Sequence, residues 1–222
     1  MWNIIVEYWL QSRPIVTEPR RVPEFLMGYW EPHTSSIDFC EPNYLLTPYI
    51  AEPHNAFSSL AITALGLIGL LYGNPTQEWR FVVMYGLFAA VGLGSFALHT
   101  TLGWLAQSLD EIPMNWVNAT YIYSLIEMQA KKSTKRIRNV EWYLLAFVVL
   151  QTIVYYQMRT WYLFFIITYT STAAIVTLWA GYLVLVKLED KEHISVCRTL
   201  YLHSLACYVV IGCVVWLLDM RR

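Results

Sequence analysis

The sequence has few charged residues for its length. Asp, Glu, Lys and Arg make up 14% of its 222 residues, whereas hydrophobic residues make up 57%. Soluble domains contain about a quarter charged residues, so this composition is too apolar for an ordinary soluble fold. The formal net charge of -1 lacks the basic excess of nucleic-acid-binding proteins, and no nucleic-acid partner is expected.

Several familiar motifs are missing as well. The four cysteines form no Cys-x-x-Cys pair and indicate no redox compartment, and no Gly-rich phosphate loop, short repeat or low-complexity tract occurs. Residues 1–26 lack the basic start and continuous apolar core of a signal peptide. We interpret them as an N-terminal extension that need not be native, with Met27 as an alternative start.

Long uncharged runs are present instead. They cover residues 53–77, 81–109, 142–158, 160–186 and 199–218, with a shorter run at 112–126. A helix of about 20 apolar residues spans the hydrocarbon core of a bilayer. The runs therefore predict an all-α, multi-pass transmembrane helix bundle rather than a soluble helical protein. The six expected spans are His54–Gly73, Phe81–Leu98, Ile112–Met128, Trp142–Gln157, Tyr162–Val186 and Thr199–Leu218.

Positive charge is concentrated in alternate connections between these spans. The connections after the first, third and fifth spans carry Arg80, then Lys131, Lys132, Lys135, Arg136 and Arg138, then Lys191 and Arg198. The other two connections carry only Arg159. Because Lys and Arg are enriched in cytoplasmic loops, the first set is predicted to be cytoplasmic and the N-terminus lumenal or external.

A dense set of oxygen donors lies just before the first span. Residues 34–44 read TSSIDFCEPNY, and Glu52 follows shortly after. Oxygen ligands suit a hard cation such as calcium. A carboxylate cluster at the edge of a membrane is costly unless a positive charge neutralises it. The segment therefore predicts a cation site at the lumenal rim of the bundle.

The same orientation brings further polar residues to this rim. Ser95 and His99 end the second span and share one helix face, Asp110 and Glu111 open the third span, and Asp219 closes the sixth. A His with a nearby Asp can serve a zinc-water site, in which the imidazole binds the metal and the carboxylate takes a proton. Two interpretations stay open: a functional cluster, or carboxylates simply exposed to water at span ends.

Three blocks of sequence resemble the alkaline ceramidase family, which are seven-span membrane amidohydrolases of the endoplasmic reticulum and Golgi. The blocks are GYWEP at 28–32 with DFCEPNY at 38–44 and YIAE at 49–52, GLGSFALHTTL at 92–102, and LDEIPM at 109–114. The resemblance implies that residues 27–222 form a single transmembrane ceramidase-like domain, with six spans here of the seven in the family fold.

The resemblance also implies a calcium site, because the family binds calcium through an Asp-Trp-Cys-Glu-x-Asn segment and a later Glu. The implied ligands are Asp38, Phe39, Glu41, Asn43 and Glu52. Phe39 replaces the family's Trp and is expected to ligate through its backbone carbonyl. The family's Glu-Phe-Trp-Asn is EPHN here, at residues 52–55. Proline suits a first helical turn, but the lost aromatic rings are expected to change the packing beside the site.

The resemblance assigns His99 as a zinc ligand and gives catalytic roles to Ser95 and Asp110. Zinc lowers the pKa of a bound water, Asp110 acts as general base, and Ser95 with the zinc stabilises the oxyanion. The implied reaction cleaves the amide bond of ceramide to a sphingoid base and a free fatty acid. The implied location is the endoplasmic reticulum and/or Golgi membrane, and the sequence does not identify a protein partner.

One departure from the family weakens the zinc prediction. The family takes its other two zinc ligands from a His-x-x-x-His motif in its seventh span, and no such motif occurs in these 222 residues. A catalytic zinc normally has three protein ligands. His54 is the alternative ligand on the correct side, whereas His193 and His203 lie toward the cytoplasmic side. The odd beginning and missing end predict an incomplete gene model or a splice variant.

Two other functions therefore stay open. One is a truncated, non-catalytic membrane relative that keeps the calcium site and binds sphingolipid or a partner. The other is a small transporter or receptor that uses the polar rim for an unrelated purpose. Calcium binding without turnover would distinguish the first of these from a hydrolase, and solute flux or a ligand response insensitive to His99→Ala would indicate the second.

Overall fold

The computed structural model describes residues 28–73, 78–132, 139–158, 162–188 and 193–214, and these residues form six α-helices. The helices are α2 (Pro53–Tyr72), α3 (Trp79–Thr101), α4 (Trp104–Lys132), α5 (Val140–Gln157), α6 (Tyr162–Tyr182) and α7 (Ile194–Ala206). Two π-helical stretches, Leu183–Lys187 and Cys207–Cys213, continue α6 and α7. The described segments contain no β-strand, which confirms the predicted all-α bundle.

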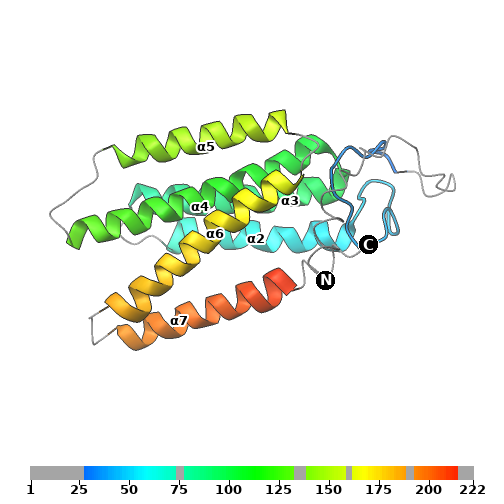
Figure 1. The fold of residues 1–222 in the computed structure, drawn as a ribbon. Coiled ribbons are helices and arrows are strands. Elements are labelled where there is room, and N and C mark those ends of the chain that lie inside the picture. The colour runs from blue at the N-terminus through cyan, green and yellow to red at the C-terminus, as the bar shows by residue number, and fades with distance from the viewer. Residues whose placement is uncertain (1–27, 74–77, 133–138, 159–161, 189–192, 215–222) are drawn as a thin grey trace, which may run out of the picture.

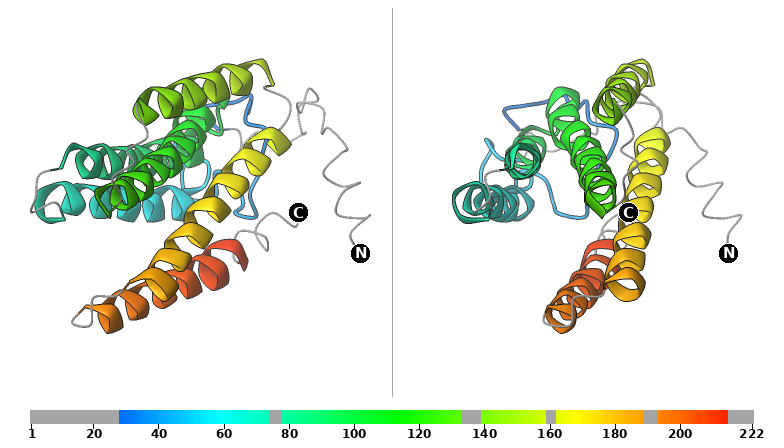
Figure 2. Two further views of the ribbon diagram at one scale, coloured as in Figure 1. Left: turned by 60° about the vertical axis from the view of Figure 1, so that its left-hand side comes forward. Right: turned by 90° about the vertical axis from the view of Figure 1, so that its left-hand side faces the viewer.

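The helices form a bundle with the N-terminal segment folded over one end. In Figure 1, α2, α3 and α4 pack together, α5 lies along α4, and α6 crosses α4 obliquely. Figure 2 shows that α7 lies beside α6, away from α2 and α3. The extension 1–26, the loop cations Lys135, Arg136, Arg138, Arg159 and Lys191, and Asp219 lie outside the described residues.

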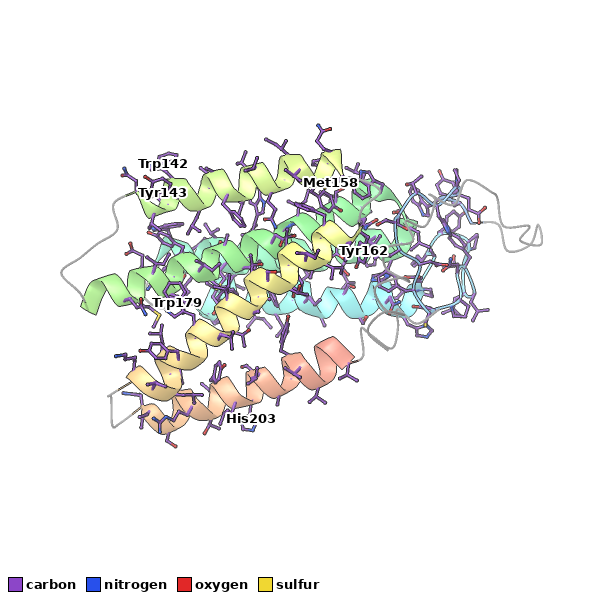
Figure 3. The ribbon with its side chains drawn as sticks, in the orientation of Figure 1. Trp142, Tyr143, Met158, Tyr162, Trp179 and His203 are labelled. Atoms are coloured by element: carbon purple, nitrogen blue, oxygen red, sulfur yellow. The ribbon has the colours of Figure 1, made fainter. Side chains whose placement is uncertain are left out.

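Length and composition qualify three helical stretches to cross a membrane: Pro53–Tyr72, Trp79–Thr101 and Tyr162–Lys187. Ile194–Val210 is a shorter apolar helix. Figure 3 shows Trp142 and Tyr143 at one end of α5, with Met158 and Tyr162 at the opposite end of the bundle. Aromatic side chains at both ends of spanning helices are typical of the two membrane–water interfaces. Three of the six expected spans, the first, second and fifth, thus qualify within the described residues, and the all-helical arrangement fits the predicted membrane bundle.

The third span begins earlier than expected. The sequence predicted a start at Ile112, but α4 begins at Trp104, so Asp110 and Glu111 lie inside the helix. Gln107 and Glu111 are buried against protein, which makes the polar first turns of α4 compatible with a helix in this position. Of the two interpretations of this rim, that of carboxylates simply exposed to water is therefore wrong for Glu111.

Helices α3 and α4 approach each other closely at Gly94. A Cβ on Gly94 would lie 2.2 Å from the carbonyl oxygen of Leu109 and 2.6 Å from the amide nitrogen of Asp110. That carbonyl has no helical donor four residues later, because Pro113 lacks an N–H. Glycine is therefore required at position 94, where the backbone of α4 packs directly on α3.

We expect Gly94→Ala to destabilise the bundle by about 2 kcal/mol, because neither backbone can move away without disturbing the rest of its helix. Gly86→Ala is the matched control, since no heavy atom lies within 4 Å of a Cβ at that position of the same helix. Thermal unfolding in one detergent compares the two variants. Equal melting temperatures for both would contradict the close approach of α3 and α4.

Candidate functional site

The segment before α2 is held against the turn between α3 and α4. The amide nitrogens of Thr34 and Ser35 donate to the Leu102 carbonyl, at 3.0 and 2.9 Å. In return, the amide of Trp104 donates to the Thr34 hydroxyl at 2.9 Å and begins α4. Leu102 itself has the left-handed conformation, with φ of 47°. These bonds place the oxygen-rich segment at the end of α3 that carries Ser95 and His99.

The residues that enter α2 also bind α3. The amide of Ala51 donates to the carbonyl of Thr100 at 3.0 Å, and the amide of Glu52 donates to the carbonyl of His99 at 2.9 Å. Carbonyls in the last turn of a helix have no partner within that helix, so an external donor satisfies them. This pairing sets the backbone of Glu52 directly beside His99.

The side chains of Glu52 and His99 form a buried pair. The Nδ1 atom of His99 lies 2.5 Å from Oε2 of Glu52, and the exposed fractions are 8% for His99 and 0% for Glu52. A carboxylate accepts hydrogen bonds, so the proton on Nδ1 faces Glu52 and the lone pair of a neutral ring lies on Nε2. A carboxylate behind a histidine orients the ring in this way in many metal sites.

Phe39 covers one face of this histidine. Its ring centroid lies 4.8 Å from that of His99, and its side chain packs with Leu98 and Ala106. The sequence predicted that Phe39 contributes a backbone carbonyl to calcium, and that role stays a prediction. The structure adds a second role, because the Phe39 ring fixes the imidazole and excludes water from that face.

Ser95 lies one helical turn before His99 and is 9% exposed. Its hydroxyl oxygen lies 2.9 Å from that of Ser59, a buried residue of α2. Sequence reasoning missed Ser59, because a serine in an apolar helix resembles any other small packing residue. The close approach of α2 to Gly92, where a Cβ would lie 2.4 Å from the amide of Thr63, brings the two serines together.

Asp110 and Glu111 are adjacent in α4 but have different surroundings. Glu111 accepts a hydrogen bond from Gln107 Nε2 at 2.8 Å and another from the Tyr155 hydroxyl at 2.7 Å. Asp110 is half-buried and lies within electrostatic range of His99. Glu111 is therefore held by structural donors on α4 and α5, whereas the Asp110 carboxylate interacts electrostatically with His99.

A second hydrogen-bond network that the sequence did not predict joins three elements. The Gln107 side chain accepts from the Ser36 amide at 2.8 Å and donates to the Ser36 hydroxyl at 2.6 Å. Because Gln107 also binds Glu111, the network runs from the N-terminal segment through α4 to Tyr155 on α5. Gln107 is fully buried, so each of these bonds forms away from water and fixes the segment on the bundle.

Glu41 binds the first turn of α2. Its Oε1 accepts from the amide and the ring Nδ1 of His54, both at 2.8 Å, and its Oε2 accepts from the Asn55 amide at 2.9 Å. Burial raises the pKa of Glu41, but these hydrogen bonds outweigh it and hold the pKa below its ordinary value. Pro53 begins the helix, as predicted. The His54 ring faces Glu41 and is largely exposed, which favours an interfacial histidine over a zinc ligand.

We expect Glu41→Gln to lower the free energy of unfolding at neutral pH by about 1 kcal/mol, as the loss of a helix cap does. The folded-state pKa of Glu41 is depressed, so its contribution is present above the unfolded-state pKa and is lost as pH falls through the folded-state value. Thermal unfolding against pH should show wild type and variant converging in acid. Glu31→Gln, which changes an exposed carboxylate of the same segment, should show no such convergence.

Two of the predicted calcium ligands have a buried oxygen atom that accepts no hydrogen bond. Oδ1 of Asn43 and Oε1 of Glu52 are buried without a hydrogen-bond partner, and the side-chain Nδ2 of Asn43 donates to Oδ1 of Asp38 at 3.4 Å. Burial and the charges of Glu31 and Glu52 raise the pKa of Tyr44 to about 12. Buried acceptors in a negative environment fit a hard cation, which would satisfy both.

A zinc ion fits less completely. His99 has the orientation of a zinc ligand, but within the described ranges no three His, Cys, Asp or Glu side chains gather closely enough to hold a metal ion. The same finding covers the three predicted calcium carboxylates, Asp38, Glu41 and Glu52. His203 does not contribute, because it is exposed on α7 and binds the Thr199 carbonyl (Figure 3). The described chain thus provides one imidazole at this place, where a catalytic zinc normally has three protein ligands.

Comparison with known proteins identifies the class of this membrane bundle. The sequence model of the family described as Ceramidase matches residues 31–221, and the chain therefore belongs to that family. This match confirms the resemblance based on the three blocks, all of which lie within or beside the matched residues.

Individual relatives support the same assignment. The chain is 36% identical over 108 residues to alkaline ceramidase 3 of Mus musculus, covering 48% of this chain and 40% of the relative. It is 37% identical over 101 residues to the alkaline ceramidase of Arabidopsis thaliana, covering 45% of this chain and 40% of the relative. Similarity to these relatives spans less than half of their length.

Proposed function

We propose that this protein hydrolyses the amide bond of a ceramide-type lipid to a sphingoid base and a free fatty acid. The observation that carries the proposal is the buried Glu52–His99 pair in a chain of the ceramidase family. Its histidine lies one helical turn from Ser95 and within electrostatic range of Asp110. Relatives of the chain carry the name alkaline ceramidase, and membership in their family supports a hydrolase that acts on a membrane lipid.

Two metal ions belong to this proposal. Calcium would be held by Asp38, the Phe39 carbonyl, Glu41, Asn43 and Glu52, and the two unpartnered oxygens support that assignment. Zinc would take His99 as one of its ligands through Nε2, with Glu52 orienting the ring. A bound zinc supplies a water molecule whose pKa is lowered toward neutrality.

The chain's own residues then divide the proton transfers. Asp110, within electrostatic range of His99, takes a proton from the attacking water as general base. Ser95 donates its hydroxyl hydrogen bond to the carbonyl oxygen of the amide as negative charge develops there. Glu52 keeps its hydrogen bond to His99 Nδ1 throughout, and Phe39 excludes water from the ring face. The proton held by Asp110 is available to the leaving amine.

The bilayer and the compartment complete the proposal. A ceramide has two hydrocarbon chains and a small polar head, so it would reach the site from within the membrane, where Ser95 and His99 lie at the end of α3. We propose the endoplasmic reticulum and/or Golgi membrane as its location, with the N-terminal segment on the lumenal side. The distribution of Lys and Arg among the connections supports that orientation.

The test is release of fatty acid from ceramide by the purified protein in a bilayer, with calcium present. An N-alkyl analogue of ceramide, which lacks the amide carbonyl, serves as the control substrate. The proposal expects fatty acid from ceramide and no cleavage of the analogue. Absence of release from ceramide would overturn the hydrolase.

A non-catalytic calcium-binding relative is the second candidate function. The observation that favours it is the contrast between the two predicted sites, since two of the predicted calcium ligands have a buried oxygen without a donor, but one imidazole marks the zinc position. This alternative predicts that ceramide binds the protein and calcium stabilises the protein, while no fatty acid appears. Both results together would select it over the hydrolase.

A further inference from the structure

The hydroxyl of Ser59 has two neighbours that can accept a hydrogen bond. It lies 2.8 Å from the carbonyl oxygen of Asn55, in its own helix, and 2.9 Å from the hydroxyl oxygen of Ser95 on α3. Ser59 is 5% exposed and Ser95 is 9% exposed, so no bulk water competes for either hydroxyl. Ser59 is absent from the residues that the family resemblance assigns to the site.

The Ser59 hydroxyl can donate its one proton to only one of these two neighbours at a time. A serine hydroxyl donates one hydrogen bond and accepts two, whereas the Asn55 carbonyl only accepts. When Ser59 donates to Asn55, the contact with Ser95 exists only if Ser95 donates to Ser59. When Ser59 turns its proton to Ser95, the proton of Ser95 is released to point elsewhere. Ser59 thereby sets the direction of the Ser95 proton.

We infer that Ser59 is a positioning residue for Ser95 in amide hydrolysis, an inference that rests on the proposed function. In the resting site the Ser95 proton is held by Ser59, which keeps the hydroxyl in place. As charge develops on the substrate oxygen, Ser59 donates to Ser95 and Ser95 donates to that oxygen. No covalent bond changes in this step, because two hydroxyl rotations reverse the direction of one hydrogen bond.

The cost of that reversal is small because the Asn55 carbonyl keeps other donors. It lies in α2, where the backbone amide four residues later donates to it independently of any side chain. The switch therefore leaves no buried acceptor without a partner, a situation that would cost about 1–3 kcal/mol. Ser58 is exposed, its hydroxyl lies 3.0 Å from the same Asn55 carbonyl, and no hydrogen bond joins it to Ser95 among the described residues, so it provides the matched control.

The experiment measures kcat and KM for ceramide in wild type, Ser59→Ala, Ser58→Ala and Ser59→Thr. Loss of one neutral hydrogen bond that orients Ser95 should lower kcat about tenfold and leave KM unchanged. Ser58→Ala should match wild type, and Ser59→Thr, which keeps the hydroxyl, should recover most of the lost rate. A purely structural defect at position 59 would not be corrected by threonine, which is larger.

A double-mutant cycle separates positioning from packing. In a Ser95→Ala background, Ser59→Ala should have no further effect on the residual rate, because no Ser95 proton remains to be directed. The inference is overturned if Ser59→Ala lowers the rate equally in both backgrounds, or if it resembles Ser58→Ala. Absence of hydrolysis by wild type would instead overturn the proposed function, and this role with it. An equal effect of Ser59→Ala in both backgrounds, or a likeness to Ser58→Ala, would overturn the role of Ser59 and leave the proposed function standing.

Discussion

Replacing His99 by alanine is expected to reduce fatty-acid release from ceramide to the background rate. The substitution removes the one imidazole of the described site and leaves the Glu52 carboxylate buried without its partner. Loss of one group that acts directly on the transition state lowers rates by about a hundredfold to a thousandfold, and loss of a metal ligand adds to that. Activity is measured alongside the melting temperature, so that an unfolded variant is recognised.

His203→Ala is the matched control for this prediction. His203 is exposed on α7 and binds the carbonyl of Thr199, so its loss should leave hydrolysis unchanged. His99→Gln provides a second test, because it retains a polar side chain of similar size opposite Glu52. Full activity in His99→Ala would remove His99 from the mechanism. If His54→Ala loses activity and His99→Ala does not, the zinc ligand would be His54, at the start of α2, and not His99.

Calcium is expected to raise the melting temperature of wild type but not that of Asp38→Ala or Glu52→Ala. A ligand at a hundred times its Kd stabilises the folded state by about 2.7 kcal/mol, provided that it does not bind the unfolded chain. Glu52→Ala should also destabilise the calcium-free protein by about 1–3 kcal/mol, because it leaves the buried Nδ1–H of His99 without an acceptor. Thermal unfolding with calcium or a chelator measures both effects.

The control for the calcium prediction is Glu31→Ala. Glu31 is an exposed carboxylate of the same segment, 3.4 Å from the Gly28 amide, and its loss removes the same charge without touching the two unpartnered oxygens. This variant should keep the full calcium shift. The calcium assignment is wrong if calcium raises the melting temperature equally in wild type, Asp38→Ala and Glu52→Ala.

The number and order of the helices followed from the sequence, because their signal is local. Runs without charge mark each helix, and five of the six described helices begin within about five residues of the expected position. The exception is α4, whose first turns contain Gln107, Asp110 and Glu111. Charged side chains beside an apolar run resemble a loop, and only the covering N-terminal segment shows that these turns are buried.

The parts of the site that lie within one helix or within a family motif could be predicted from the sequence. Ser95 and His99 are four residues apart in α3, and their shared face was expected. The partners that complete the site are far apart in sequence: Glu52 joins His99 across 47 positions, and Ser59 joins Ser95 across 36. No periodicity encodes such pairings, because they depend on how two helices pack and which small residues let them approach.

The contacts of residues 28–52, the segment before α2, determine the order in which parts of this protein can fold during synthesis. Ser36 is synthesised before its partner Gln107, which lies 71 positions later in the chain. Thr34 likewise is synthesised before its partners Leu102 and Trp104. Domains commonly fold from the N-terminus during synthesis, at about 5–20 residues per second. Here the segment that contains Thr34 and Ser36 lacks its hydrogen-bond partners for several seconds, until α2 and α3 have been synthesised and α4 has begun. The Glu52 carboxylate and the Phe39 ring therefore reach His99 late, so a chain in which α3 or α4 fails to insert does not form the candidate site.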